Sequence, residues 1–171
     1  QVQPMITTPG HASLPSGHCV EAYVVSEVLQ ALLGMSRTDP LQENLRRQFG
    51  RTAARIAMNR VVAGVHFPID NLAGRLLGEV LGRYFVFFCG AVPTDPAAPV
   101  LQHAIFRGDR CDGHEDFEPD RQSIFGGRRP ACYQTEAIRN VVAGQPQPSV
   151  LIPIWEKARA ELKDLQLAFD S

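Results

Sequence analysis

Four stretches of the chain repeat their apolar residues at the three- and four-residue spacing of an α-helix. The first begins at Ser16 and stops at Gly34, and the second opens at Asp39-Pro40, an N-cap candidate followed by a proline that suits the first turn. No stretch shows the sustained alternation of a strand, so the predicted fold class is all-α. The pattern predicts helices over residues 16–34, 39–62, 69–88 and 152–168.

Glycine and proline residues separate these stretches, and glycine also recurs within the third one. Gly64 and Pro68 interrupt the pattern between the second and third helices, because glycine is permissive and the residue before proline leaves the helical region. Within the third helix Gly74, Gly78 and Gly82 recur every four residues. This spacing predicts a flat stripe on which another helix can pack closely.

Composition narrows the class of protein. The chain has 171 residues, of which 44% are hydrophobic and 20% charged, with a net charge of −1, and this length suits about one domain. The near-zero charge predicts no broad nucleic-acid surface. The best candidate for a membrane span, residues 72–89, contains Arg75, Glu79 and Arg83, so we expect a soluble chain without a span. The cellular compartment stays open.

The four cysteines lack the C-x-x-C spacing of zinc sites and thioredoxin-like sites. Cys19 and Cys89 lie among apolar residues, and we expect them in the core. Cys111 and Cys132 lie in polar stretches, and we expect them in loops, where they could pair in an oxidising compartment.

The first candidate site is Pro15-Ser16-Gly17-His18, directly before the first predicted helix. A helix start offers unpaired N–H groups and the positive end of the helix dipole, and glycine lets an anion approach the backbone. Serine adds a hydroxyl donor and histidine a proton carrier. Taken alone, these residues fit an ordinary N-cap, Ser16, followed by a first-turn histidine.

The second candidate site combines Arg60, His66 and Asp70. Arg60 is predicted in the last turn of the second helix, His66 in the loop and Asp70 at the start of the third helix. The four-residue step from His66 to Asp70 lets the carboxylate hold one ring nitrogen while the other attacks or ligates. The alternative is a helix-capping Asp70, a turn histidine and a solvated Arg60.

Together, Pro15-Ser16-Gly17-His18 and Arg60-x5-His66-x3-Asp70 resemble the second and third signature motifs of one superfamily. It unites type 2 phosphatidic acid phosphatases, bacterial class A acid phosphatases and vanadium-dependent haloperoxidases. The segment GVHFPIDNLAG is similar to the phosphatase version, and HASLPSGH to the peroxidase branch. The resemblance spans residues 9–90 and implies an antiparallel helical bundle with an anion site at helix ends.

The resemblance also implies a domain organisation. Residues 1–91 would be the C-terminal half of the helical core, and residues 92–171 a loop-rich extension that ends in a helix and packs on the same domain. The anion-binding residues would be Ser16, the backbone of Gly17, and Arg60, which neutralises the phosphate or vanadate oxygens. His11 lies in the loop before Pro15, and from that position it could line the entrance to the site.

The resemblance implies chemical roles for three further residues. His66 would be the nucleophile toward phosphorus, or the axial ligand of vanadium, and Asp70 would orient it. His18 would be the general acid for the leaving group. This division suits phosphoryl transfer, which needs positioning and charge neutralisation above all.

Two departures from the family pattern shape the expectations. The third motif begins Asn59-Arg60 where Ser-Arg is usual, and the first motif, a lysine followed seven residues later by Arg-Pro, is absent upstream of Pro15. We expect a missing N-terminal segment or another chain to complete the bundle. Residues 16–34 or 69–88 would then expose an apolar surface for it. A homo-oligomer is also possible.

Three functions follow from the resemblance. The favoured one is a phosphoric monoester hydrolase that acts on a small-molecule phosphate ester through a phosphohistidine on His66, without a metal or cofactor. The second is a haloperoxidase that requires vanadate and oxidises halide with peroxide. The third is a non-catalytic oxyanion-binding or structural homologue.

Overall fold

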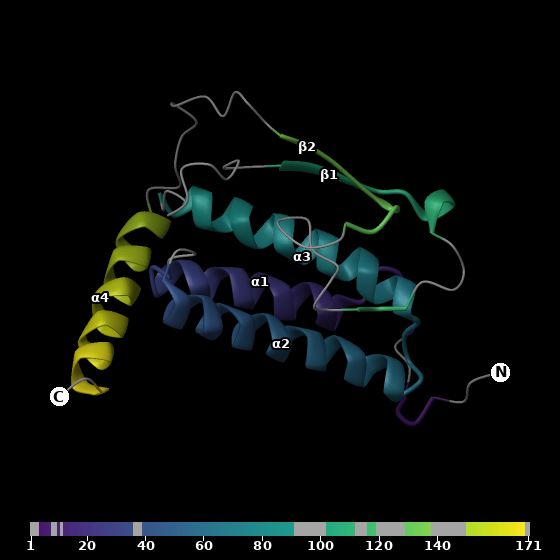
Figure 1. The fold of residues 1–171 in the computed structure, drawn as a ribbon, viewed down its shortest axis with the longest axis horizontal. Helices are drawn as coiled ribbons and strands as arrows, with labels where there is room; N and C mark the ends of the chain where they lie inside the picture. Colours follow the sequence, from purple (N-terminus) through teal and green to yellow (C-terminus); the bar gives the residue numbers. More distant parts are fainter. Residues whose placement is uncertain are drawn as a thin grey trace.

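Three helices form the body of the molecule (Figure 1). They are α1 (Gly17–Leu32), α2 (Pro40–Val62) and α3 (Pro68–Phe88). The computed structural model describes residues 4–7, 10, 12–35, 39–90, 102–111, 116–118, 129–137 and 150–169. α1 and α3 run in the same direction and α2 runs in the opposite one (Figure 1). The starts of α1 and α3 and the end of α2 therefore lie at one end of the bundle.

The C-terminal elements pack around these helices. Strands β1 (Gln102–Phe106) and β2 (Tyr133–Ala137) pair antiparallel, with Phe106 opposite Tyr133, and β1 packs on α3. A single 3₁₀ turn follows β1 at Gly108–Arg110. Helix α4 (Leu151–Phe169) crosses the other end of the bundle and contacts α1 (Figure 1). None of the described helices combines the length and the apolar character that a membrane span requires.

The helices begin and end at the capping, glycine and proline residues that the sequence places there. Oδ1 of Asp39 accepts a hydrogen bond from the backbone N–H of Leu41 at 2.9 Å, which caps α2 as predicted. Gly34 and Gly64 adopt φ values of 61° and 73° just after α1 and α2, a region that favours glycine. Each of the four helices begins and ends within two residues of its predicted bounds, and the helical fold class is confirmed.

The glycine stripe on α3 is a contact surface for α1, as its spacing predicts. A Cβ atom on Gly74 would lie 2.8 Å from the carbonyl oxygen of Ser16, and one on Gly78 would lie 2.7 Å from that of Val20. Gly82 is equally crowded against α1. The backbones of α1 and α3 are therefore closer than any side chain at these positions would allow.

The core reaches beyond the helical bundle, which corrects one expectation. Cys132 is fully buried rather than in a polar loop, because it directly precedes β2, and Cys111 packs against the same cluster. Cys19 and Cys89 are buried as predicted, and all four cysteines are thiols. The buried cluster comprises Cys19, Tyr23, Ala53, Ala54, Ala57, Leu72, Leu76, Phe117, Cys132 and Tyr133.

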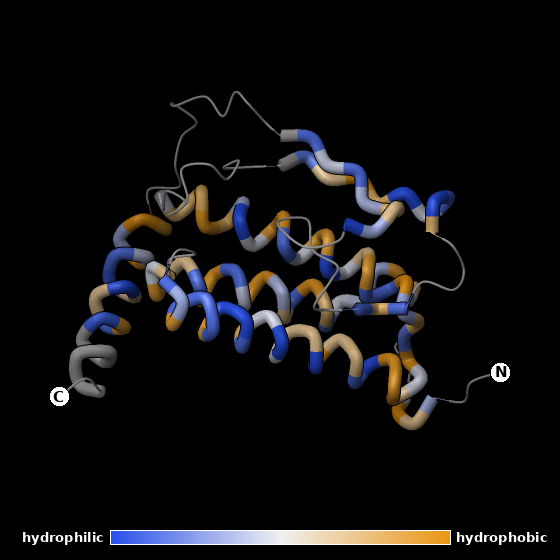
Figure 2. The backbone as a smooth tube through the Cα atoms, viewed as in Figure 1, coloured by the Kyte–Doolittle hydropathy of each residue, from blue (hydrophilic) through white to orange (hydrophobic). Residues whose placement is uncertain are grey.

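The two strands are a departure from the all-helical prediction. Each has only five residues, and the sequences QHAIF and YQTEA mix polar and apolar side chains. Figure 2 shows much of this sheet in hydrophilic colours, in contrast to the apolar stretches of α3. Pairing with a distant partner, rather than a local hydrophobic pattern, defines these strands.

One side of α3 carries the exposed apolar surface expected within residues 69–88. The exposed side chains follow one another at intervals of four, three and one residues, which places them along one stripe of the helix. They are Leu77, Leu81, Tyr84 and Phe85.

We expect Gly78→Ala to lower the free energy of unfolding by about 1–3 kcal/mol, as overpacking does. Its Cβ would lie 2.7 Å from the Val20 carbonyl oxygen and 2.8 Å from Cβ of Tyr23. Gly50→Ala is the matched control, because Gly50 lies inside α2 with nothing within 4 Å. It should raise the free energy by about 0.5–1 kcal/mol. Urea denaturation measures both, and equal stabilities would contradict the close contact.

Candidate functional site

Ser16 joins the start of α1 to the start of α3. Its backbone N–H donates to the carbonyl oxygen of Asp70 at 3.0 Å, and the residue is fully buried. The side chain makes no N-cap hydrogen bond, and its Oγ has no partner among the residues that the structure describes. Ser16 is therefore not an ordinary side-chain N-cap, and its hydroxyl is a buried polar group without a partner in this part of the structure.

Asp70 holds His66 in the loop between α2 and α3. Oδ2 of Asp70 lies 3.3 Å from Nδ1 of His66 and accepts a second hydrogen bond from the backbone N–H of Phe67 at 2.9 Å. The two side chains are 8% and 3% exposed. Because a carboxylate only accepts hydrogen bonds, this contact places a ring proton on Nδ1 of His66. The predicted contact is thus present, and Asp70 also caps α3.

Arg60 lies in the last turn of α2 and is half-buried. Its backbone carbonyl accepts a hydrogen bond from Val65 at 3.2 Å, so the loop to His66 folds back on this turn. The Nε atom is buried without a hydrogen-bond partner in the described part of the chain. A buried guanidinium donor of this kind suits an oxyanion, to which arginine binds through charge-assisted hydrogen bonds.

The remaining predicted residues are less closely tied to the site by contacts. Gly17 and His18 are exposed in the first turn of α1, at the same end of the bundle as Arg60 and His66. Over the described ranges, no hydrogen bond joins His18 to the other site residues. His11 lies outside the described residues.

A layer of buried polar side chains, absent from the sequence predictions, follows Asp70 along α3. Nδ2 of Asn71 donates to the Ala57 carbonyl at 2.9 Å, and Nε of Arg75 lies 2.8 Å from Oε1 of Glu79. The guanidinium of Arg75 stacks 4.9 Å above the ring centre of Tyr23. The available signal was the four-residue spacing of Asn71, Arg75 and Glu79 within a mostly apolar helix.

Burial and nearby charges shift the pKa values of Arg75 in this layer and of Cys19, which faces it from α1. It raises the pKa of the Cys19 thiol to about 12, an effect that the Arg75 charge opposes and the Glu79 charge assists. Burial disfavours the charge on Arg75, but attraction to Glu79 leads the contributions that raise the pKa of Arg75 above its usual value. Cys19, next to His18, is therefore a neutral thiol and no candidate nucleophile.

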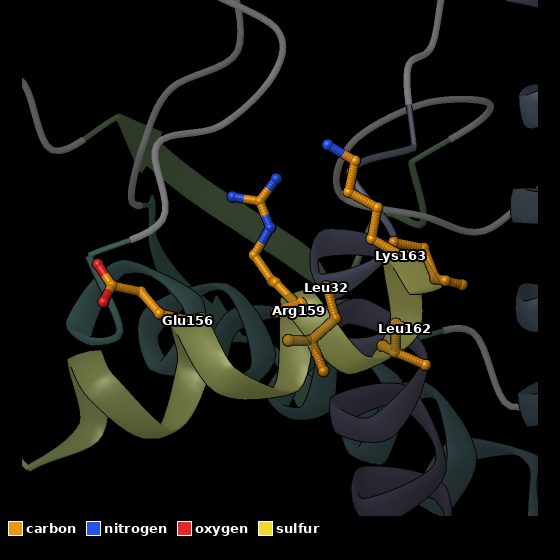
Figure 3. Close-up of a pocket in the computed structure, with 8 residues that line it drawn as sticks. Leu32, Glu156, Arg159, Leu162 and Lys163 are labelled. Carbon is orange, nitrogen blue, oxygen red and sulfur yellow. The ribbon is translucent and has the colours of Figure 1, made fainter. Parts of the chain in front are cut away.

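A cavity of about 470 Å³ lies at the opposite end of α1, against α4 (Figure 3). Arg159 and Lys163 extend from α4 in a similar direction, beside the apolar side chains of Leu32 and Leu162 (Figure 3). Since α1 has 16 residues, this end is roughly 24 Å from Ser16. The cavity is lined by Leu32, Leu33, Gly34, Glu156, Arg159, Ala160, Leu162 and Lys163, none of them a predicted site residue.

Comparisons with known proteins point to the same family as the motifs. A family model described as the PAP2 superfamily matches residues 1–90. The chain is also similar to a vanadium-dependent bromoperoxidase from Ascophyllum nodosum, at 28% identity over 94 residues. That alignment covers 43% of this chain and 17% of the bromoperoxidase, so the chain spans less than a fifth of that relative. No solved structure matches the chain.

We expect stability to fall at alkaline pH in a way that depends on Cys19. Its pKa is about 12 in the folded chain against an ordinary 9.0, so between these values only the unfolded chain releases the proton. The contribution of Cys19 to the free energy of unfolding keeps its full value below pH 9. Above pH 9 it declines by up to about 1.4 kcal/mol per pH unit. Denaturation curves of Cys19→Ala should therefore decline less steeply above pH 9. Below pH 8 the two proteins should differ by a constant amount, and parallel curves throughout would contradict the shift.

Proposed function

The chain belongs to the PAP2 superfamily, and from that premise we propose that it binds a tetrahedral oxyanion at the converging helix ends and hydrolyses phosphoric monoesters there. One observation carries the proposal. Two buried polar atoms, Oγ of Ser16 and Nε of Arg60, have no partner among the described residues, and a carboxylate holds His66 at the same end of the bundle.

The energetics of these two atoms support an anion ligand. A buried donor without a partner destabilises a protein by about 1–3 kcal/mol, and the penalty is larger for a charged group. Phosphate oxygens that accept hydrogen bonds from Ser16 and Arg60 would offset it. The exposed backbone of Gly17, in the first turn of α1, adds an N–H donor at the positive end of the helix dipole.

The proposed reaction proceeds in two steps. The lone pair on Nε2 of His66 attacks phosphorus, the bond from phosphorus to the ester oxygen breaks, and His18 donates a proton to the leaving oxygen. A water molecule, deprotonated by His18, then attacks the phosphohistidine and releases inorganic phosphate. Asp70 keeps the proton on Nδ1 and stabilises the positive ring that forms. We place this reaction first because each of its steps can be assigned to a side chain of this chain.

A vanadate-dependent haloperoxidase is the second candidate, and the bromoperoxidase relative is the observation that favours it. The residues present fit vanadate, because it offers tetrahedral oxygens to the same donors, Ser16 and Arg60, and His66 would ligate vanadium through Nε2. When bound, vanadate would supply the activation of peroxide for halide oxidation. His18 would then hold or move a proton at the edge of the site.

We also propose that the apolar stripe of Leu77, Leu81, Tyr84 and Phe85 on α3 is covered in the working protein. Contiguous apolar surface of this kind marks an interaction site. An upstream segment or another chain that carries the lysine of the first motif would bury the stripe, complete the bundle and add a second cation to the oxyanion site.

His66→Ala should abolish hydrolysis of an aryl phosphate, and acid quenching of the unmodified protein should trap phosphate on His66. His18→Ala should slow turnover by about 10²–10⁴-fold, and least for leaving groups that need no proton. His103→Ala is the control, because His103 is exposed on β1. Steady-state kinetics and mass spectrometry of the quenched protein provide the measurements. Full activity in His66→Ala would exclude the phosphohistidine.

The two enzymatic candidates should respond in opposite ways to vanadate. A phosphatase should hydrolyse an aryl phosphate without vanadate and be inhibited by it, because both anions use Ser16, Gly17 and Arg60. A haloperoxidase should oxidise bromide with peroxide only after vanadate is added, and phosphate should inhibit it. Halide oxidation without phosphatase activity in the vanadate-free protein would overturn the hydrolase, and silence in both assays would favour the non-catalytic homologue.

A further inference from the structure

Asn71 is hydrogen-bonded to both neighbouring helices of the bundle. Its side chain is fully buried, and Nδ2 donates to the carbonyl oxygen of Ala57 on α2 at 2.9 Å. The backbone carbonyl oxygen of Asn71 accepts a hydrogen bond from Sγ of Cys19 on α1 at 3.3 Å. This single residue of α3, adjacent to Asp70, therefore links the three helices whose ends carry the candidate site.

The link to α2 bears directly on Arg60. Helix α2 packs mainly against α1 and touches α3 only lightly. Ala57 lies three residues before Arg60, slightly less than one helical turn. A hydrogen bond at Ala57 therefore sets the height and rotation of the last turn of α2 relative to the start of α3, where Asp70 holds His66.

The amide oxygen of Asn71 indicates that a contribution to stability alone does not explain why an asparagine is buried here. Oδ1 of Asn71 is buried and has no hydrogen-bond partner in the ranges that the structure describes. A buried acceptor in this state destabilises the fold and requires an explanation. The Nδ2 donor, which reaches the Arg60-bearing helix, provides one.

We propose that Asn71 is a positioning residue, whose amide holds the end of α2 where Arg60 meets the anion bound by Ser16 and His66. This inference rests on the proposed oxyanion site. Asn71 acts through Arg60 and does not itself touch the anion. The proposal therefore predicts that the effects of Asn71 and Arg60 on anion binding are coupled.

A double-mutant cycle on the full chain tests this coupling, with inorganic phosphate as the probe and calorimetry as the measurement. Asn71→Ala should raise the dissociation constant of phosphate about 10- to 100-fold, because loss of a charge-assisted hydrogen bond changes a binding constant by about that factor. In the Arg60→Ala background the same change should have no further effect. Leu76→Ala, a buried truncation on the same helix, is the control and should leave the constant within about twofold.

Two results would overturn the positioning role. One is an equal weakening by Asn71→Ala with and without Arg60, and the other is an equal weakening by Leu76→Ala. If Asn71→Ala does not fold, Asn71→Leu keeps about the size of the side chain, removes the donor without adding a charge and should show the same coupling. Circular dichroism identifies the folded variants before titration.

Hydrogen–deuterium exchange separates this inference from the proposed function. Asn71→Ala should raise exchange in the last turn of α2, residues 58–62, and not in its first half, whether or not the protein binds an anion. Unchanged exchange there would overturn the positioning role even if phosphate binds. Raised exchange in a protein that binds neither phosphate nor vanadate would refute the oxyanion site and limit Asn71 to holding α2.

Discussion

The close backbone contact between α1 and α3 is the constraint on which the rest of the structure depends. Gly74 and Gly78 let the carbonyl oxygens of Ser16 and Val20 lie only 2.8 and 2.7 Å from the positions that Cβ atoms would take. At this separation the N–H of Ser16 reaches the carbonyl of Asp70. Because functional groups must be held to within about 0.5 Å, a small widening of this contact would separate the two motifs of the site. The same contact between Ser16 and α3 therefore packs the two helices together and brings the two motifs of the candidate site together.

The candidate site divides its residues between local and long-range contacts. His66 and Asp70 lie four residues apart, and the same carboxylate oxygen that holds His66 also caps α3. Ser16 and Arg60 come from other helices, and each keeps a buried polar atom without a partner among the described residues. Beneath them Arg75 and Glu79 pair inside the bundle, where an apolar layer would be at least as stable. These buried polar groups are the features for which the proposed oxyanion site would account.

The helices and half of the site could be predicted from the sequence because their signals are local. Asp39-Pro40, Gly34 and Gly64 mark helix ends by backbone chemistry, and His66 and Asp70 are only four residues apart along the chain. The sheet was missed because β1 and β2 are short, mixed in polarity and paired across a long separation. Cys132 was misplaced for the same reason, since its burial depends on that pairing. The spacing of Asn71, Arg75 and Glu79 could have indicated a buried polar layer, but the partner of Asn71, a backbone carbonyl of α2, could not be read from the residue pattern.

The division between local and long-range contacts also sets the order in which the site can form. The pair of His66 and Asp70 needs only the first turn of α3, whereas the contact from Cys19 to Asn71 joins residues 52 positions apart. Closing that loop has an entropic cost that must be met before the contact stabilises anything, so such contacts form late in folding. A partly folded chain would already hold a histidine beside a carboxylate, yet it would lack the Ser16 anchor. The proposed anion site would therefore be complete only when the whole bundle has folded.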